Sequence, residues 1–299
     1  DKAKVVIKPR VTQKVAPALS KIFLFSLAAG LLIGIAFVYF KGLLRVSISH
    51  RKELESLSSV TILGQISKNE TDKTIVVNKG SSSSLVELFR NIRNNIGFIL
   101  GRKENAVILI TSTIPKEGKS FIGSNLAMSF ALNYKRVLII GLDIRNPQLA
   151  KNFELPLSKG ITSCLNGDVE NWKELVMTYS NQPNLDILQG GTIPPNPNEL
   201  LMSPVLSKII EEAREIYDVV ILDTAPVGVI SDTFLISQYA DLTLYIVREK
   251  YTHKDSVAFI NEQKESMRLP NMYIVYNDVD PNNDNYRYGY GRSYGYGDK

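Results

Sequence analysis

Three polar segments carry residue types that bind phosphate and a divalent cation, and each follows an apolar run. The segment 111–120 reads TSTIPKEGKS and resembles a Walker A loop, although Thr113 stands where the first glycine of that loop is expected. Asp143 and Asp223 each come directly after another apolar run. Backbone N–H groups in such a loop bind phosphate oxygens, and nearby carboxylates bind Mg²⁺. The pattern predicts a nucleotide site with ATP and Mg²⁺ as its ligands.

These segments give each candidate residue an expected role. Lys119 would reach the β- and γ-phosphates, and the hydroxyl of Ser120 would bind Mg²⁺. Asp143 and Asp223 would complete the metal site and orient the attacking group. Asn277, after the last apolar run, is a candidate contact for the adenine base, with a purely structural role as the alternative. The candidate catalytic residues are Lys119, Asp143, Arg145 and Asp223, and the candidate nucleotide-binding residues are Pro115, Lys116, Glu117, Gly118, Lys119, Ser120, Phe121 and Asn277.

The elements that must position these residues alternate along the chain. The expected strands are apolar runs at 106–112, 136–142, 184–189, 218–223, 242–247 and 272–277. The expected helices lie near 85–100, 119–133, 198–216, 231–239 and 253–267. Strand–helix alternation requires crossover connections, and these give a parallel sheet with both faces covered. We therefore expect an α/β fold of the P-loop NTPase type, with a mostly parallel sheet and helices on both faces.

Composition excludes several classes of protein. Apolar residues make up 44% and charged residues 22% of the chain, which is ordinary globular usage and excludes global disorder. The single cysteine, Cys164, cannot form an intramolecular disulfide. The chain has only two histidines, far apart in sequence, so a zinc site built from Cys and His is not expected. A net charge of +5 over 299 residues is too small to indicate a nucleic-acid partner, and none is expected.

One long apolar segment predicts a membrane helix. Residues 22–40 contain no charged side chain, and that length nearly spans a hydrocarbon core of about 30 Å. The flanks carry six Lys or Arg before the segment and four after it, which weakly favours a cytoplasmic N-terminus. The ATP site requires the opposite orientation. The predicted organisation is an extracytoplasmic juxtamembrane segment (1–21), a transmembrane helix (22–44), a cytoplasmic linker (45–84), a P-loop domain (85–280) and a flexible tyrosine-rich tail (281–299).

Together these motifs resemble the bacterial tyrosine kinases of the Wzc-like polysaccharide co-polymerase group, from their last transmembrane helix onward. The Walker A motif of that family is matched at 115–120 and its Walker B motif at 221–226. The additional A′ motif is matched in part at 140–145, where Gly141 replaces the first aspartate, and 195–201 also looks like the family. The resemblance implies a membrane-anchored, Mg-ATP-dependent protein-tyrosine autokinase in the bacterial inner membrane. Its kinase domain would be cytoplasmic and would regulate capsule or exopolysaccharide polymerisation and export.

The resemblance also implies partners. Glu87, Arg90 and Arg93 match a motif that joins subunits into a ring, an octamer in this family, although the spacing alone favours an intrahelical ion pair. Further expected partners are the lipid membrane, the polysaccharide export and polymerisation machinery, and a cognate tyrosine phosphatase. Glycine alternates with tyrosine in the tail, which disfavours a helix there. The expected phosphoacceptors, presented to neighbouring subunits, are Tyr286, Tyr288, Tyr290, Tyr294 and Tyr296.

Two other functions remain open from the sequence. One is a partitioning-type membrane ATPase of the MinD/ParA kind, but Ile114 stands where the signature lysine of that class would fall. The other is a co-polymerase scaffold with a degenerate nucleotide site, which Gly141 supports. Asp143 would take over from the missing aspartate in an active kinase.

Overall fold

The structure is a computed structural model that describes residues 19–43, 46–101 and 103–281. The chain divides into two compact units, Asp1–Val46 and Ser47–Lys299. The first unit contains helix α1 (Leu19–Leu43), which begins three residues before the predicted membrane helix. Its segment Leu19–Phe37 is long and apolar enough to cross a membrane, by length and composition. The predicted phosphoacceptor tyrosines lie outside the described residues.

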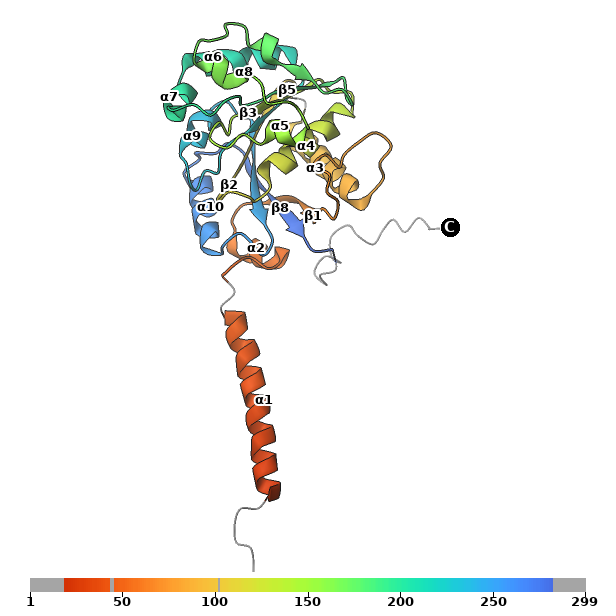
Figure 1. Cartoon of the computed structure of the whole chain (residues 1–299), viewed down its shortest axis with the longest axis vertical. Coiled ribbons are helices and arrows are strands. Elements are labelled where there is room, and N and C mark those ends of the chain that lie inside the picture. The colour runs from red at the N-terminus through yellow and green to blue at the C-terminus, as the bar shows by residue number, and fades with distance from the viewer. Residues whose placement is uncertain (1–18, 44–45, 102, 282–299) are drawn as a thin grey trace, which may run out of the picture. The chain divides into compact units, whose positions relative to one another are not determined.

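An eight-stranded sheet forms the centre of the second unit (Figure 1). The strand order is β1-β8-β7-β2-β6-β3-β5-β4, and every pair is parallel except the antiparallel pair β4–β5. The strands are β1 (Ile62–Ser67), β2 (Ala106–Ser112), β3 (Val137–Gly141), β4 (Met177–Thr178), β5 (Leu185–Leu188), β6 (Val219–Asp223), β7 (Leu242–Arg248) and β8 (Met272–Val279). The mostly parallel sheet expected from strand–helix alternation is confirmed.

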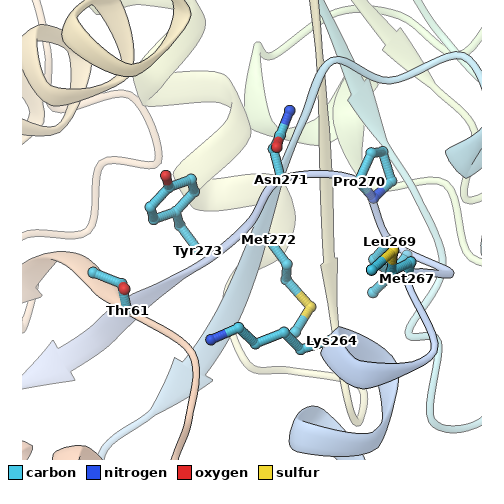
Figure 2. Close-up of a pocket in the computed structure, with 8 residues that line it drawn as sticks. All are labelled: Thr61, Lys264, Met267, Leu269, Pro270, Asn271, Met272 and Tyr273. Carbon is cyan, nitrogen blue, oxygen red and sulfur yellow. The ribbon is translucent and has the colours of Figure 1, made fainter.

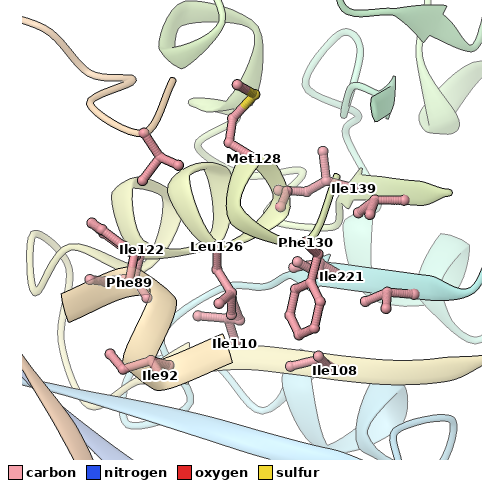
Figure 3. Close-up of a cluster of buried hydrophobic side chains, with 14 of the residues drawn as sticks. Phe89, Ile92, Ile108, Ile110, Ile122, Leu126, Met128, Phe130, Ile139 and Ile221 are labelled. Atoms are coloured by element: carbon pink, nitrogen blue, oxygen red, sulfur yellow. The ribbon is translucent and has the colours of Figure 1, made fainter. Parts of the chain in front are cut away.

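Helices cover both faces of the sheet because alternate strand residues point to opposite sides. On one face, Ile108 and Ile110 of β2 pack with side chains from α3 (Ser84–Leu100), α4 (Lys119–Ala131) and α5 (Leu149–Asn152) (Figure 3). On the other face, Val107 and Leu109 pack under a second layer. That layer consists of α6 (Ile161–Leu165), the 3₁₀ helix η1 (Trp172–Leu175), α7 (Pro197–Leu201), α8 (Pro204–Ile216) and α9 (Asp232–Ser237). Helix α10 (Asp255–Glu265) and helix α2 (Arg51–Leu57) continue it over β7 and β8.

Residues 47–83 correct the predicted boundary between linker and domain. The structure places them in the same compact unit as the sheet, whereas the sequence predicts a linker at 45–84 and a domain that begins at residue 85. Strand β1 pairs with β8 along the sheet edge, and Ile48 and Leu54 are fully buried. Within the predicted linker, residues 62–67 therefore form an edge strand of the domain.

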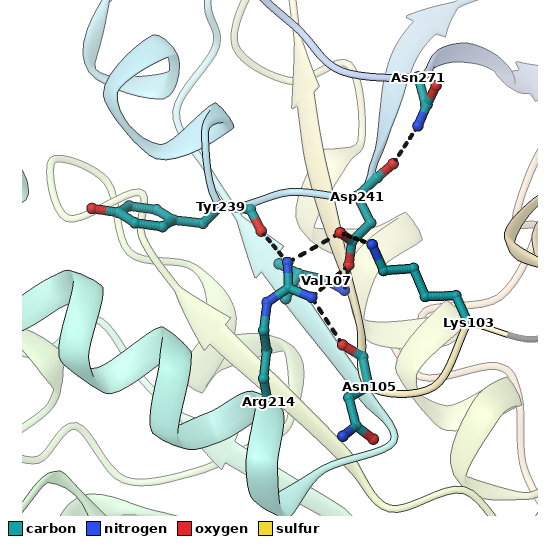
Figure 4. A network of polar contacts seen from close by, with 7 residues as sticks. All are labelled: Lys103, Asn105, Val107, Arg214, Tyr239, Asp241 and Asn271. Atoms are coloured by element: carbon teal, nitrogen blue, oxygen red, sulfur yellow. Dashed lines mark hydrogen bonds and ion pairs between the residues drawn. The ribbon is translucent and has the colours of Figure 1, made fainter.

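A partly buried ion-pair network fixes the loops at the N-terminal ends of the central strands (Figure 4). The carboxylate of Asp241 lies 2.7 Å from Lys103 Nζ and 2.8 Å from Arg214 Nη1. It also accepts the backbone N–H of Val107 at 2.8 Å, and Asn271 Nδ2 donates to the Asp241 carbonyl at 2.8 Å. The two central strands β2 and β7 are thus tied together at this end, while their opposite ends carry the polar segments singled out in the sequence.

Candidate functional site

The loop between β2 and α4 forms a cradle of backbone N–H groups. Lys116 and Gly118 both have positive φ angles, +68° and +99°, on either side of Glu117. Successive turns of this kind direct neighbouring N–H groups toward a common point, which suits an anion. A side chain at residue 118 would collide with Asn277 Nδ2, so glycine is required there by space as well as by φ.

A pocket of about 480 Å³ lies at this loop and contains most of the predicted site. Side chains from three strand ends meet there because β2, β6 and β3 are adjacent and parallel. Of the predicted residues, the pocket is lined by Pro115, Lys116, Gly118, Lys119, Ser120, Phe121, Asp143 and Arg145. It is completed by Asn146, Gln148, Asn152, Pro226, Val229 and Ile230.

Asp223 lies behind the pocket wall as a buried carboxylate. It is 1% exposed, and its Oδ1 has no hydrogen-bond partner among the described residues. Burial raises the pKa of Asp223 to about 6 and the Asp143 carboxylate adds to this, while the Ser120 hydroxyl and the Lys119 ammonium act in the opposite direction. An oxygen left unpaired in the interior is costly unless a ligand satisfies it.

Asp143 is tied to Asp223 through the backbone. The N–H groups of Leu142 and Asp143 donate to the Asp223 carbonyl at 2.8 and 3.0 Å. One carboxylate oxygen of Asp143 accepts the N–H of Asn146 at 3.1 Å, and burial raises the pKa of Asp143. The two carboxylates therefore keep a fixed spacing across the strand ends.

These donors fit Mg²⁺. The cation prefers oxygen ligands, and in nucleotide sites it is held by one or two carboxylates, waters and the phosphates themselves. Ser120, Asp143 and the unpaired Oδ1 of Asp223 supply that set. Within the described residues, no group of three or more His, Cys, Asp or Glu side chains is placed so that it could hold a metal ion.

Arg145 reaches the pocket as half of an ion pair that the sequence did not reveal. Its Nε lies 2.9 Å from Asp232 Oδ2, and its Nη2 donates to Asp232 Oδ1 at 3.4 Å. Asp232 is buried at the start of α9, 87 residues away in sequence. In the sequence, Asp232 is recognisable only as an acidic residue in the first turn of a predicted helix. Acidic residues are common there because they interact favourably with the helix dipole, so the pairing with Arg145 could not be inferred.

Three residues support the loop from behind instead of lining the pocket. The Glu117 side chain is fully buried and accepts hydrogen bonds from the Ile114 N–H at 2.8 Å and from the Thr252 hydroxyl. Asn277 Nδ2 donates to the Glu117 carbonyl at 2.9 Å, which is the structural role weighed for it above. Arg248 donates to the Lys116 carbonyl at 2.8 Å. The Glu117 side chain therefore points away from the pocket, and the binding role predicted for this residue would fall to its backbone.

Gly141, the departure in the A′ motif, stands in a confined place at the end of β3. A Cβ at this position would lie 3.0 Å from the backbone N of Gly190, which is tighter than about nine in ten real Cβ contacts. An aspartate here requires the loop after β5 to move.

The predicted subunit motif forms local contacts on α3. Glu87 and Arg90 form an intrahelical ion pair, and Arg90 Nη2 donates to the Ser81 carbonyl at 2.9 Å. Arg93 Nη1 donates to the Ser129 carbonyl of α4 at 3.0 Å. The intrahelical pair favoured by spacing alone is present, and the ring contact stays a prediction.

A second pocket, of about 510 Å³, lies around the start of β8 and the C-terminal end of α10 (Figure 2). Its lining includes Thr61, Lys264, Met267 and Tyr273. None of the residues predicted from sequence lines it.

The fold and the site define a P-loop NTPase-like α/β protein, and comparison with known proteins narrows this class. No protein-family model matches the chain. Tyrosine-protein kinase ptk of Acinetobacter johnsonii is 30% identical over 279 residues, which cover 89% of this chain and 38% of that protein. Tyrosine-protein kinase YwqD of Bacillus subtilis strain 168 is 37% identical over 176 residues, which cover 59% of this chain and 73% of that protein. The BceF tyrosine kinase domain superposes with a TM-score of 0.68 at 26% identity, covering 78% of this chain and 99% of that domain.

The chain belongs to the bacterial tyrosine-protein kinase family, as the resemblance indicated. It spans less than two fifths of the length of the Acinetobacter protein.

Proposed function

We propose that this chain is the kinase portion of a membrane-anchored protein-tyrosine autokinase that uses Mg-ATP. The observation that carries the proposal is the meeting of Lys119, Ser120, Asp143 and Asp223 at the ends of three adjacent parallel strands, in a chain of this family. The acceptors would be the tail tyrosines of a neighbouring subunit, at positions 286, 288, 290, 294 and 296.

The residues of the chain divide the chemistry between them. The loop N–H groups and the Lys119 ammonium would bind the phosphate oxygens and stabilise the charge that develops during transfer. Ser120, Asp143 and Asp223 would hold Mg²⁺, which supplies further neutralisation of the phosphates when bound. Asp143 lies on the pocket wall, where its carboxylate would accept the phenol proton as the tyrosine oxygen forms its bond to phosphorus and ADP leaves.

Cellular context extends the proposal. Helix α1 would anchor the chain in the bacterial inner membrane with the kinase domain in the cytoplasm, since ATP is required there. A homo-oligomeric ring, octameric by resemblance, would use Glu87, Arg90 and Arg93 after the Glu87–Arg90 pair opens. Ring assembly and phosphorylation would regulate capsule or exopolysaccharide polymerisation and export, and a cognate phosphatase would reset the tail.

Mass spectrometry tests the proposal directly. The full chain, solubilised in detergent, is compared with Lys119→Met after incubation with Mg-ATP. We expect species heavier by about 80 Da per phosphate in the first protein and none in the second. Absence of phosphotyrosine in both would refute the kinase proposal.

Tyr134 provides an internal check on the acceptor assignment. It is 89% exposed, more than any other described tyrosine outside α1, so it is the folded-domain tyrosine most open to adventitious modification. We expect phosphate on residues 286–296 in preference to Tyr134. Phosphate confined to Tyr134 would contradict the tail assignment while leaving kinase activity intact.

Gly141 favours one second candidate, a co-polymerase scaffold with an impaired nucleotide site. That function predicts weak ADP binding and no phosphotyrosine in the same preparation. ATP hydrolysis without phosphotyrosine would instead favour the partitioning-type ATPase.

A further inference from the structure

The conformation of the phosphate loop depends on the residue at its centre, Glu117. Lys116 and Gly118 on either side have positive φ angles, and a side-chain-bearing residue such as Lys116 adopts this conformation only under constraint. The loop therefore needs contacts that hold it in place before any nucleotide arrives.

Glu117 makes those contacts on three sides. Its Oε2 accepts the N–H of Ile114 at 2.8 Å, its Oε1 accepts the hydroxyl of Thr252, and its main-chain carbonyl accepts Asn277 Nδ2 at 2.9 Å. Both the Glu117 and the Thr252 side chains are fully buried. A buried carboxylate with these partners is costly to displace and equally costly to leave unpaired.

Thr252 is itself held so that its hydroxyl can donate only toward Glu117. Its Oγ1 accepts the N–H of Arg248 at 2.8 Å, which directs the hydroxyl proton to the carboxylate. Its backbone N–H donates to the Arg248 carbonyl at 3.0 Å, and its carbonyl accepts the N–H of Ile48 at 2.9 Å. The threonine thus has no freedom to follow the loop if the loop moves.

Removal of this single donor has a defined consequence. Without the Thr252 hydroxyl, Glu117 Oε1 loses a partner in a space that solvent does not reach. Glu117 is anchored at both ends, by its carboxylate and by its main-chain carbonyl, so a shift of the side chain would strain the adjoining peptide groups of Lys116 and Gly118. Those groups form the proposed phosphate cradle.

We propose that Thr252 is a positioning residue for nucleotide binding that acts through Glu117. The inference rests on the proposed nucleotide site. It predicts that the hydroxyl of Thr252 sets the affinity for nucleotide phosphates while leaving the chemical step, carried by other residues, largely intact.

The test compares Thr252→Val, which removes the hydroxyl, with Thr252→Ser, which keeps it. Binding of a fluorescent ADP analogue with Mg²⁺ is titrated on the full chain in detergent. We expect about tenfold weaker binding by Thr252→Val, which corresponds to about 1.4 kcal/mol, and binding by Thr252→Ser within about twofold of the unmodified chain. In kinase assays, Thr252→Val should raise KM for ATP by a similar factor while kcat changes little.

Thr243→Val is the matched control. Thr243 is also fully buried, but its hydroxyl has no hydrogen-bond partner among the described residues, so its removal should not alter binding. Glu117→Gln gives a second variant of unchanged shape if Thr252→Val does not fold. The NH₂ group of the glutamine would face either the Ile114 N–H or the Thr252 hydroxyl, and both of these are donors in the unmodified chain. We therefore expect several-fold weaker binding of the ADP analogue.

The outcomes separate this inference from the proposed function. If the unmodified chain binds the analogue and Thr252→Val binds it equally well, the positioning role is overturned while the kinase proposal stands. Equal weakening in Thr252→Ser and Thr252→Val would also overturn it, because the hydroxyl would then be irrelevant. An unmodified chain that binds no nucleotide would overturn the proposed function and this inference with it.

Discussion

Replacement of Asp223 by asparagine is expected to stabilise the folded domain while abolishing its response to Mg²⁺ and nucleotide. Asp223 closes β6 and is 1% exposed, and its Oδ1 has no partner among the described residues. Burial raises its pKa from 3.8 to about 6. Keeping this group ionised at neutral pH therefore destabilises the folded protein, as expected of a site built for a cation.

The size and pH dependence of the effect follow from the two pKa values. A difference of about 2 pH units, at about 1.4 kcal/mol each, gives about 3 kcal/mol of destabilisation once the carboxyl is ionised. The pKa of Asp223 is higher in the folded than in the unfolded protein, so the protonated carboxyl favours folding. This contribution to the free energy of unfolding is fully present below pH 3.8 and is lost as pH rises through about 6. The asparagine side chain of the variant cannot ionise, but its buried amide also lacks partners. We expect Asp223→Asn to be more stable by about 1–3 kcal/mol above pH 6, and the gain should vanish near pH 4.

Equilibrium unfolding in urea measures this directly on the full chain in detergent. Trp172 is the only tryptophan in the sequence and is buried, so its fluorescence reports on the domain. Curves at several pH values between 4 and 8, with and without Mg²⁺ and ADP, give the free energy of unfolding. Asp223→Asn should gain nothing from Mg-ADP. A variant that is less stable than the unmodified chain at neutral pH, or that keeps the Mg-ADP stabilisation, would refute the reasoning.

Three further predictions use the same assays. Asp241→Asn should lower the free energy of unfolding by about 1–3 kcal/mol, since it weakens the charged hydrogen bonds that partly buried Arg214 makes. In the unmodified chain, burial raises the pKa of Asp241 but the hydrogen bonds of Arg214, Lys103 and Val107 together lower it, so stability should also fall as pH drops below about 4. Gly141→Asp should lower the free energy of unfolding by about 1–3 kcal/mol, because its Cβ approaches Gly190, and phosphotyrosine blots should show no gain in activity. Gly118→Ala should weaken binding of the fluorescent ADP analogue by more than about tenfold, since alanine disfavours positive φ and would strike Asn277.

The central sheet could be predicted from sequence because its strands are continuous apolar runs. Residues 106–112 are buried along their whole length, and such runs stand out against polar loops. Strand β1 could not be found in the same way. Most of its residues are only half-buried, and its partner β8 lies about 200 residues later, so no local signal marks the pairing. The error in the predicted linker follows from that non-local contact.

The pocket residues could be predicted because the topology of a parallel sheet brings strand ends together whatever the detailed packing. What the spacing did not supply is the direction in which each side chain points. Glu117 lies between two residues that line the pocket, yet its own side chain enters the interior. Its partner Thr252 and the partner of Arg145, Asp232, are reached only through tertiary contacts. A sequence motif therefore identifies the residues that line such a site but not the residues that position them.

The missing carboxylate at Gly141 constrains how the remaining residues divide their roles. A Cβ at the end of β3 would press on the backbone of Gly190, and the carboxylates present at the strand ends are Asp143 and Asp223. Asp223 is buried beside Ser120, with an unpaired oxygen, and suits a metal ligand. Asp143 lines the pocket and suits the proton acceptor. Arg145 forms its ion pair with Asp232, so neither Asp143 nor Asp223 is its salt-bridge partner, although its charge still helps to lower the pKa of Asp143 against the effect of burial.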